Sequence, residues 1–199
     1  MCIYAECAAK IDSIVSFSDK RVLEIGCGSG ELLKEILKYN PKHIIGIDLV
    51  LSEWWGIGES QGENWCVKDG NAEALSFYDN SFDIIISTAT FEHINNVEAA
   101  LSEIKRVLKP YGVFYTSFMP IWTSVVGHHF GANSATTWDV ELVKLIPPWG
   151  HLYMDEAEMT EHLLKINAGD KVNIDNAVDF IYRSKIINRL SRTEVYTHI

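Results

Sequence analysis

The first 118 residues alternate short apolar runs with segments whose apolar residues recur every three or four positions. The short runs predict buried strands, and the periodic segments predict helices with one buried face. The expected strands are residues 21–25, 43–47, 64–67, 83–87 and 113–118, and the expected helices are residues 5–17, 31–39 and 96–108. Because strands and helices alternate, we predict an α/β fold with a doubly wound, mostly parallel sheet. Asn95 is the expected N-cap of the third helix, with Glu98 completing a capping-box variant.

Beyond residue 118 the regular pattern ends. Residues 119–153 are irregular and rich in tryptophan, histidine, proline and glycine, and long segments of this kind are usually functional when they are ordered. Asp155 with Glu158 predicts the start of a helix that reaches about residue 166, and another helix is expected near residues 177–187. Ser191 and Glu194 form a further capping box. We expect all 199 residues to form a single domain with a regular part, residues 1–118, and an irregular part, residues 119–199.

Composition narrows the class of protein. With 47% hydrophobic residues the chain can fill a core, yet no apolar run approaches the roughly 18–20 residues that span a bilayer. The first residues carry Glu6 and Lys10 and have no basic leader, so they are not expected to be a signal peptide. Cys2, Cys7, Cys27 and Cys66 form no Cys-x-x-Cys pair, which favours a reduced, cytoplasmic setting. The net charge of −10 disfavours nucleic acid as a partner.

The most informative segment is a glycine turn that follows the first apolar strand. Gly26, Gly28 and Gly30 leave the turn without side chains, so that a ligand can lie against bare backbone. Asp48 ends the second strand 18 residues after Gly30, where a carboxylate is suited to accept hydrogen bonds from two ribose hydroxyls. The pattern therefore predicts a cofactor that contains a nucleoside.

The glycine spacing argues against two common nucleotide sites. A dinucleotide fingerprint needs a third small residue, and the candidate positions hold Glu31 or Leu33. A phosphate-binding loop is excluded because no Gly-Lys-Ser/Thr follows. Glu24 would also repel a pyrophosphate, whereas it suits a ligand that carries an ammonium and a sulfonium.

Five motifs, in this order, resemble the class I S-adenosylmethionine-dependent methyltransferases, and most of all their broad UbiE-like or type 11 group. They are residues 22–30, 46–48, 71–75 with 80–83, 91–93 and 104–112. Two positions depart from that group's pattern, because Asn71 replaces the usual aspartate and Tyr111 replaces the first glycine of a Pro-Gly-Gly turn. Members of this class end with an antiparallel strand pair that is not visible here. We therefore expect either a shortened sheet or a piece of a longer chain.

The resemblance implies S-adenosylmethionine as the cofactor, a cofactor-binding core in residues 1–118 and acceptor-side elements in residues 119–199. Asp48 would bind the ribose, and Asn71 and Ala72 would bracket the adenine, although Asn71 can also be read as a simple turn residue. His93 would touch cofactor or substrate, or else serve as local structure. The full set of expected cofactor-binding residues is Glu24, Gly26, Cys27, Gly28, Gly30, Asp48, Leu49, Asn71, Ala72, Thr88 and His93.

Candidate catalytic residues lie in the irregular segment. His128, His129 and His151 are natural bases near neutral pH and lie close in sequence to Trp122 and Trp149. Their spacing matches no standard metal-ligand pattern, and we expect no metal. They would line the pocket of the acceptor, which stacking tryptophans suggest is a sugar or an aromatic. The alternative is a loop whose tryptophans pack and whose histidines lie in solvent.

The expected function is an enzymatic one, the transfer of a methyl group from S-adenosylmethionine to an oxygen, nitrogen or carbon atom of a small molecule. Two alternatives remain open. One is a non-catalytic relative that keeps the cofactor pocket or only the fold. The other, which Glu31 and Leu33 disfavour, is a nicotinamide-dependent oxidoreductase or epimerase.

Overall fold

The computed structural model describes residues 3–49, 51, 56–132 and 138–198, so that Cys2 lies outside the described residues. The chain divides into two compact units, Met1–Phe118 and Met119–Ile199. They are called unit 1 and unit 2 below. The division falls where the sequence pattern changes from regular to irregular.

Unit 1 is built on a parallel sheet. The described strands form one six-stranded sheet in the order β3-β4-β2-β1-β5-β6. Their bounds are β1 Arg21–Ile25, β2 His43–Asp48, β3 Ser60–Gln61, β4 Trp65–Asp69, β5 Phe82–Thr88 and β6 Leu108–Ser117. All neighbouring pairs are parallel except β3 with β4. The chain order reverses beside β1, which pairs with both β2 and β5, and ligands bind in open α/β sheets at such a switch point.

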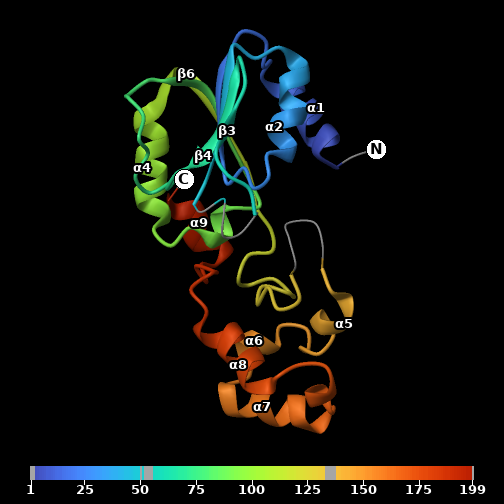
Figure 1. Cartoon of the computed structure of the whole chain (residues 1–199). Coiled ribbons are helices and arrows are strands. Elements are labelled where there is room, and N and C mark those ends of the chain that lie inside the picture. The colour runs from blue at the N-terminus through green and yellow to red at the C-terminus, as the bar shows by residue number, and fades with distance from the viewer. Residues whose placement is uncertain (1–2, 50, 52–55, 133–137, 199) are drawn as a thin grey trace. The chain divides into compact units, whose positions relative to one another are not determined.

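Helices cover both faces of this sheet (Figure 1). On one face lie α1 (Ile3–Ile14) and α2 (Glu31–Ile36), and on the other lies α4 (Val97–Val107). The 3₁₀ turn η1 (Leu37–Tyr39) extends α2, and a second 3₁₀ turn, η2 (Phe91–His93), follows β5. The doubly wound, mostly parallel architecture expected from the sequence is confirmed.

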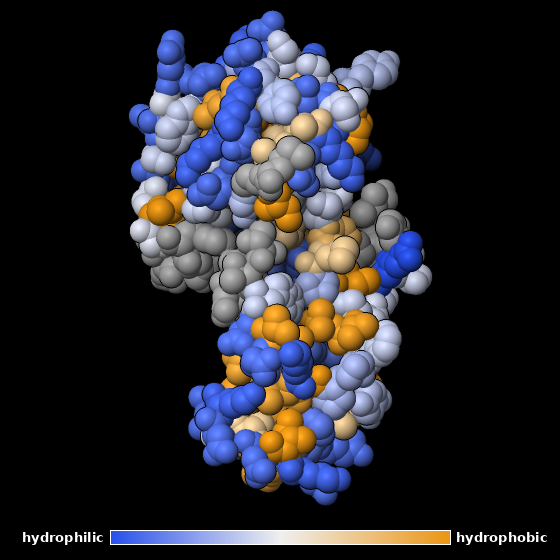
Figure 2. Space-filling model, turned by 90° about the vertical axis from the view of Figure 1, so that its right-hand side faces the viewer, coloured by the Kyte–Doolittle hydropathy of each residue, from blue (hydrophilic) through white to orange (hydrophobic). Residues whose placement is uncertain are grey.

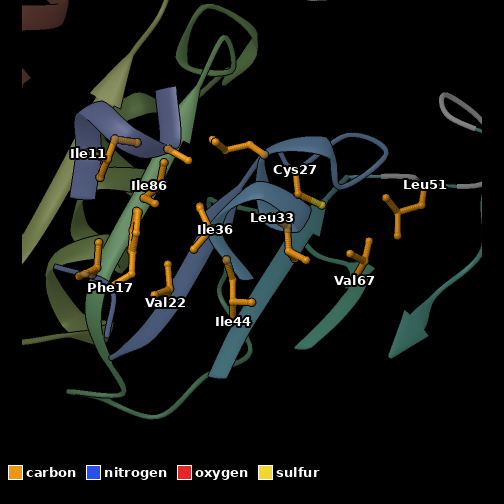
Figure 3. Close-up of a cluster of buried hydrophobic side chains, with 13 residues drawn as sticks. Ile11, Phe17, Val22, Cys27, Leu33, Ile36, Ile44, Leu51, Val67 and Ile86 are labelled. Carbon is orange, nitrogen blue, oxygen red and sulfur yellow. The ribbon is translucent and has the colours of Figure 1, made fainter. Parts of the chain in front are cut away.

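A cluster of buried apolar side chains packs α1 and α2 onto the sheet (Figure 3). Ile11 of α1 and Phe17, which follows α1, meet Val22 and Ile86 of the central strands. Cys27, from the glycine turn, is part of the same cluster. Packing of the core therefore fixes the turn on which the candidate site stands.

Unit 2 has a helical core of its own. Its elements are α5 (Val140–Val143), α6 (Gly150–Tyr153), α7 (Glu156–Lys165), η3 (Ala168–Asp170), α8 (Ile174–Arg183) and α9 (Arg192–His198). The buried cluster consists of Leu145, Ile146, Met159, Leu163, Ala168, Ala177, Val178 and Ile181. Hydrophobic residues also reach the surface of this unit (Figure 2), and the large ones include Val140, Trp149, Leu152, Tyr153, Leu164 and Ile166. No helix in the described part of the chain is long and apolar enough to cross a membrane.

The structure corrects several details of the sequence-based prediction. The N-cap of α4 is Asn96 rather than Asn95, because the Asn96 side chain accepts a hydrogen bond from the backbone N–H of Ala99. The two-residue strand β3 was missed, since two exposed polar residues carry no alternation. Strand β6 begins five residues earlier than expected, at Leu108. The capping box at Asp155 and Glu158 is confirmed, as is the one at Ser191 and Glu194.

Candidate functional site

The glycine turn joins β1 to α2 at the carboxyl end of the sheet. Gly26, Gly28 and Gly30 all have positive φ angles, of 73°, 52° and 78°. This region of backbone conformation costs an L-residue about 1–2 kcal/mol, so glycine is the residue that suits all three positions. The backbone N–H groups of Gly26 and Cys27 both donate to the carbonyl of Ile47, at 2.8 and 3.0 Å. The turn is therefore anchored to the end of β2.

The space beside Gly26 is occupied by a protein side chain. A Cβ atom placed on Gly26 would lie 2.0 Å from Oγ1 of Thr90. The same Oγ1 atom donates a hydrogen bond of 2.9 Å to the carbonyl of Thr88. Gly26 thus allows the segment after β5 to approach the turn. Gly30 differs, because a Cβ atom there would meet only Cγ2 of Val67, at 3.5 Å.

Asp48 holds the turn from the second strand. The residue is 8% exposed, and its two carboxylate oxygen atoms accept the backbone N–H groups of Gly28 and Leu49, both at 2.9 Å. A carboxylate has about four lone-pair positions, so each oxygen can accept one hydrogen bond more. The geometry leaves Asp48 able to bind a diol while it fixes the loop.

Glu24 is a second buried acid, close to the Asp48 carboxylate. It is 2% exposed, and its Oε2 atom has no hydrogen-bond partner among the residues that the structure describes. Burial first, and the Asp48 carboxylate second, raise the pKa of Glu24 to about 8, although a hydrogen bond from the backbone N–H of Leu33 partly offsets this. Buried carboxyl groups are normally paired. The Oε2 atom of Glu24 is therefore available to a cationic or hydrogen-bonding group.

The loop after β4 carries the expected adenine contacts. Oδ1 of Asn71 accepts the backbone N–H of Glu73 at 2.9 Å, so this oxygen supports a local turn, and Ala72 is buried. Arg106 of α4 donates to the carbonyls of Leu75 and Phe77 and holds this loop in place. The turn role of Asn71 is thus established, and a contact between its amide and a ligand stays a prediction.

The end of β5 brings further polar groups to this edge of the sheet. Ser87 is fully buried, and its Oγ atom has no hydrogen-bond partner in the described part of the chain. Thr88 follows it, and His93 lies in η2, where its backbone N–H donates to the carbonyl of Thr90 at 2.8 Å. Because β5 is the neighbour of β1, its carboxyl end lies beside the glycine turn. The residues expected from the sequence to bind the cofactor include Thr88 and His93 but not Ser87 or Thr90.

The three candidate histidines of unit 2 are buried. His128, His129 and His151 are 0%, 5% and 4% exposed, so the alternative in which they lie in solvent is wrong. The His151 ring packs edge-on against Trp122, with centroids 4.6 Å apart, and against His128 at 5.2 Å. His129 packs against Trp138 at 5.8 Å. These contacts form an aromatic cluster within unit 2.

Hydrogen bonds assign the protons in this cluster. Nδ1 of His128 accepts the backbone N–H of Phe130 at 2.9 Å, so the proton of the neutral ring is on Nε2. Nε2 of His151 lies 2.7 Å from the carbonyl of Trp122 and must donate to it, which leaves Nδ1 of His151 as a bare acceptor. Burial lowers the pKa of both rings, and that of His128, which the neighbouring His151 and His129 lower further, falls to about 3. His151 is therefore the member of this pair whose available nitrogen can accept a proton.

A comparison with known protein families agrees with the geometry of unit 1. Residues 23–116 match a family model described as a methyltransferase domain. These residues therefore form a methyltransferase domain. The matched segment contains the glycine turn, Asp48 and the end of β5, so the polar edge of the sheet lies entirely within this methyltransferase domain.

Curated relatives match the methyltransferase domain and not the whole chain. A sterol 24-C-methyltransferase of Gibberella zeae is 34% identical over 99 residues, which make up 47% of this chain and 26% of that protein. An uncharacterized methyltransferase of Schizosaccharomyces pombe is 37% identical over 91 residues, or 46% of this chain and 36% of that protein. The chain thus spans between a quarter and about a third of the length of these two relatives.

Solved structures share the fold over more of the chain. A Methanococcus maripaludis protein classed as an S-adenosyl-L-methionine-dependent methyltransferase aligns with a TM-score of 0.53 and 19% identity. The alignment covers 92% of this chain and 77% of that one. A Galdieria sulphuraria protein classed as a sarcosine dimethylglycine methyltransferase gives 0.51 and 16%, covering 88% and 75%. At these identities the likeness concerns the Rossmann-like fold alone.

Proposed function

We propose that this chain is an enzyme that transfers a methyl group from S-adenosylmethionine to an oxygen, nitrogen or carbon atom of a small-molecule acceptor. The observation that carries the proposal is the Glu24 carboxyl group, buried without a partner for Oε2 beside Asp48 at the glycine turn of a methyltransferase domain. A pyrophosphate would gain no charge attraction from this acid, whether Glu24 is neutral or ionised. A cofactor that bears an ammonium and a sulfonium fits the charge of the site.

Each binding residue has a role in this proposal. Asp48 would accept the ribose hydroxyls on the two lone pairs that its backbone contacts leave. Asn71, Ala72 and Leu49 would contact the adenine, and the turn of Gly26, Cys27, Gly28 and Gly30 would pass beneath the cofactor. Thr88 and His93 would complete the pocket at the end of β5.

The protein's main task would be alignment. The cofactor supplies a methyl group that is already activated, so the residues need to orient the acceptor and exclude water. An alcohol or phenol acceptor would also need a base. We propose the histidines of unit 2 for this task, with His151 ahead of His128 and His129 because its Nδ1 atom is an unprotonated acceptor.

The class of acceptor is proposed from chemistry. The tryptophans around the histidines suit a sugar or an aromatic ring, which both present a stacking face. The relative from Gibberella zeae is named for a sterol, and the exposed apolar residues of unit 2 would suit a lipophilic acceptor of that kind. Three cysteines without disulfides, Cys7, Cys27 and Cys66, suit a reducing, cytoplasmic setting.

Calorimetry tests the proposed cofactor. S-Adenosylhomocysteine should bind and NAD should not. Asp48→Ala should weaken binding about ten- to a hundredfold or more, because a hydrogen bond to a charged group is worth roughly 1.5–3 kcal/mol. Asp69→Ala is the matched control, since Asp69 ends the adjacent strand β4 and its carboxylate also accepts a backbone N–H, that of Leu51. Equal affinities in the wild type and Asp48→Ala would remove Asp48 from the site, and binding of NAD alone would favour the oxidoreductase alternative.

Turnover tests the catalytic proposal once an acceptor is found. His151→Asn should lower turnover by about 10²–10⁴-fold and leave the affinity for the cofactor unchanged, as expected for loss of a general base. His129→Asn and His128→Asn are the comparisons, and a loss of the same size in one of them would move the role to that ring. Cofactor binding without transfer to any of a broad panel of acceptors would favour the non-catalytic alternative.

A further inference from the structure

Glu24, on the strand that leads into the glycine turn, affects which ligand the site retains. Resting on the proposed function, we propose that Glu24 loses its proton when the positively charged methyl donor binds. The ionised carboxylate then attracts the donor, so that the site selects the cationic donor over its neutral product. Glu24 would then determine specificity by charge, in addition to any contact that its carboxyl group makes.

Glu24 is buried, and its Oε2 atom has no hydrogen-bond partner among the residues that the structure describes. The groups around it are either negatively charged or neutral. Asp48 on β2 repels the ionised form, while the backbone N–H of Leu33 on α2 donates to it. Burial first, and the charge of Glu24 second, raise the pKa of the Cys7 thiol of α1 and of the Cys27 thiol of the turn. Lys10, on the exposed side of α1, lowers the pKa of Cys7, whereas no cation of the described residues is among the causes that shift the pKa of Glu24. In unit 1, no lysine or arginine among the described residues forms an ion pair with Glu24 or Asp48.

Glu24 is therefore mostly neutral before a ligand binds. With a pKa of about 8 its carboxyl group is about nine-tenths protonated at pH 7. A positive charge brought within about 4–6 Å of a carboxyl group favours the ionised form and lowers its pKa. The proton then leaves the Glu24 oxygen for the buffer, and the charge pair that remains lies in a buried site where attraction is strong.

The donor and its product differ in the charge that drives this exchange. S-Adenosylmethionine carries an ammonium, a sulfonium and a carboxylate, and its net charge is +1. When the methyl group leaves, the sulfonium becomes a neutral thioether and the net charge falls to zero. Glu24 can then take a proton back from solvent, so that the product loses a charge interaction that the donor had. By linkage, affinity for the donor should rise with pH between about 6.5 and 8.5 more steeply than affinity for the product.

Proton counting by calorimetry tests this inference. Binding of S-adenosylmethionine and of S-adenosylhomocysteine is measured in buffers of different ionisation enthalpy between pH 6.5 and 9. For the donor at pH 7 we expect close to one proton released, up to about 0.9 from Glu24, falling with a midpoint near pH 8. For the product we expect a much smaller release. Glu24→Gln keeps the shape of the side chain, should abolish the difference between the two ligands, and reports any proton that the ligands themselves release.

A second variant keeps the test independent of Glu24→Gln. Asp48→Asn removes the charge that repels ionised Glu24, so the midpoint of proton release should move to lower pH even if binding weakens. Donor binding without proton release at pH 7, or equal release for donor and product, overturns the inference and leaves the proposed function standing. Absence of binding by either ligand overturns the proposed function, and this inference with it.

Discussion

The positions with positive φ show how a local pattern and a distant contact combine. Three glycines at this spacing predict a tight turn, because glycine adopts positive φ angles at no steric cost. That Thr90 fills the space beside Gly26 could not be predicted, since it depends on packing between segments 64 residues apart. The sequence likewise shows an acid at position 24, but it does not show that this acid is buried or that its Oε2 atom lacks a hydrogen-bond partner.

A comparison of two glycines separates backbone strain from steric overlap. Gly30→Ala should cost about 1–2 kcal/mol in the free energy of unfolding, because only the positive φ opposes it. Gly26→Ala should cost roughly 1–3 kcal/mol more, because its Cβ atom also meets the Thr90 side chain. Thr90→Gly should recover part of that excess in the double variant. Urea unfolding measures all four proteins, and equal costs at Gly26 and Gly30 would contradict the close approach.

At the scale of helices and strands, strong local sequence patterns were sufficient to predict the elements. The apolar runs of β1, β2 and β5 and the capping box of α7 predicted those elements, because burial on both faces and a cap leave a clear pattern. Boundaries that depend on neighbours were less accurate. Adjacent asparagines could each cap α4, and the structure selects Asn96, whose backbone N–H also donates to Glu73 of the preceding loop.

The two asparagines provide a matched test of this cap. Asn96→Ala should destabilise the protein by about 0.5–2 kcal/mol, because it leaves the Ala99 N–H without its acceptor. Asn95→Ala changes the same residue type one position earlier at an exposed site, and should lie within about 0.5 kcal/mol of the wild type. Thermal or urea unfolding distinguishes them. The larger loss at Asn95 would restore the cap that the sequence suggested.

At the scale of the whole molecule, the two units were only partly predictable. The sequence located the change at residue 118, yet it described residues 119–153 as irregular. In the structure part of this segment contributes Leu145 and Ile146 to a core with α7 and α8. Burial of the histidines could not be read from the sequence either, since it depends on rings such as Trp122 and Trp138 that pack around them. Each unit consequently has its own apolar core and its own buried titratable group.

These two groups predict opposite effects of pH on the two units. The pKa of Glu24 rises from 4.5 to about 8 on folding, so native unit 1 holds an extra proton between those values. The stability this proton gives is complete below pH 4.5 and is lost as pH rises to 8. The pKa of His128 falls from 6.5 to about 3, so it is the unfolded state of unit 2 that binds the extra proton. Its contribution is complete above pH 6.5 and is lost as pH falls toward 3.

Two pH windows therefore isolate the two groups in the full chain. Between pH 6.5 and 8 the contribution of His128 is constant, and Glu24→Gln should flatten the fall in stability that the wild type shows as pH rises. Between pH 3.5 and 4.5 the contribution of Glu24 is nearly constant, and His128→Asn should reduce the loss of stability on acidification while its side-chain oxygen still accepts the Phe130 N–H. Scanning calorimetry at each pH measures both slopes, whether the units melt together or apart. A wild-type slope retained by Glu24→Gln in the first window, or by His128→Asn in the second, would show that the group concerned is not buried in the protonation state assigned to it.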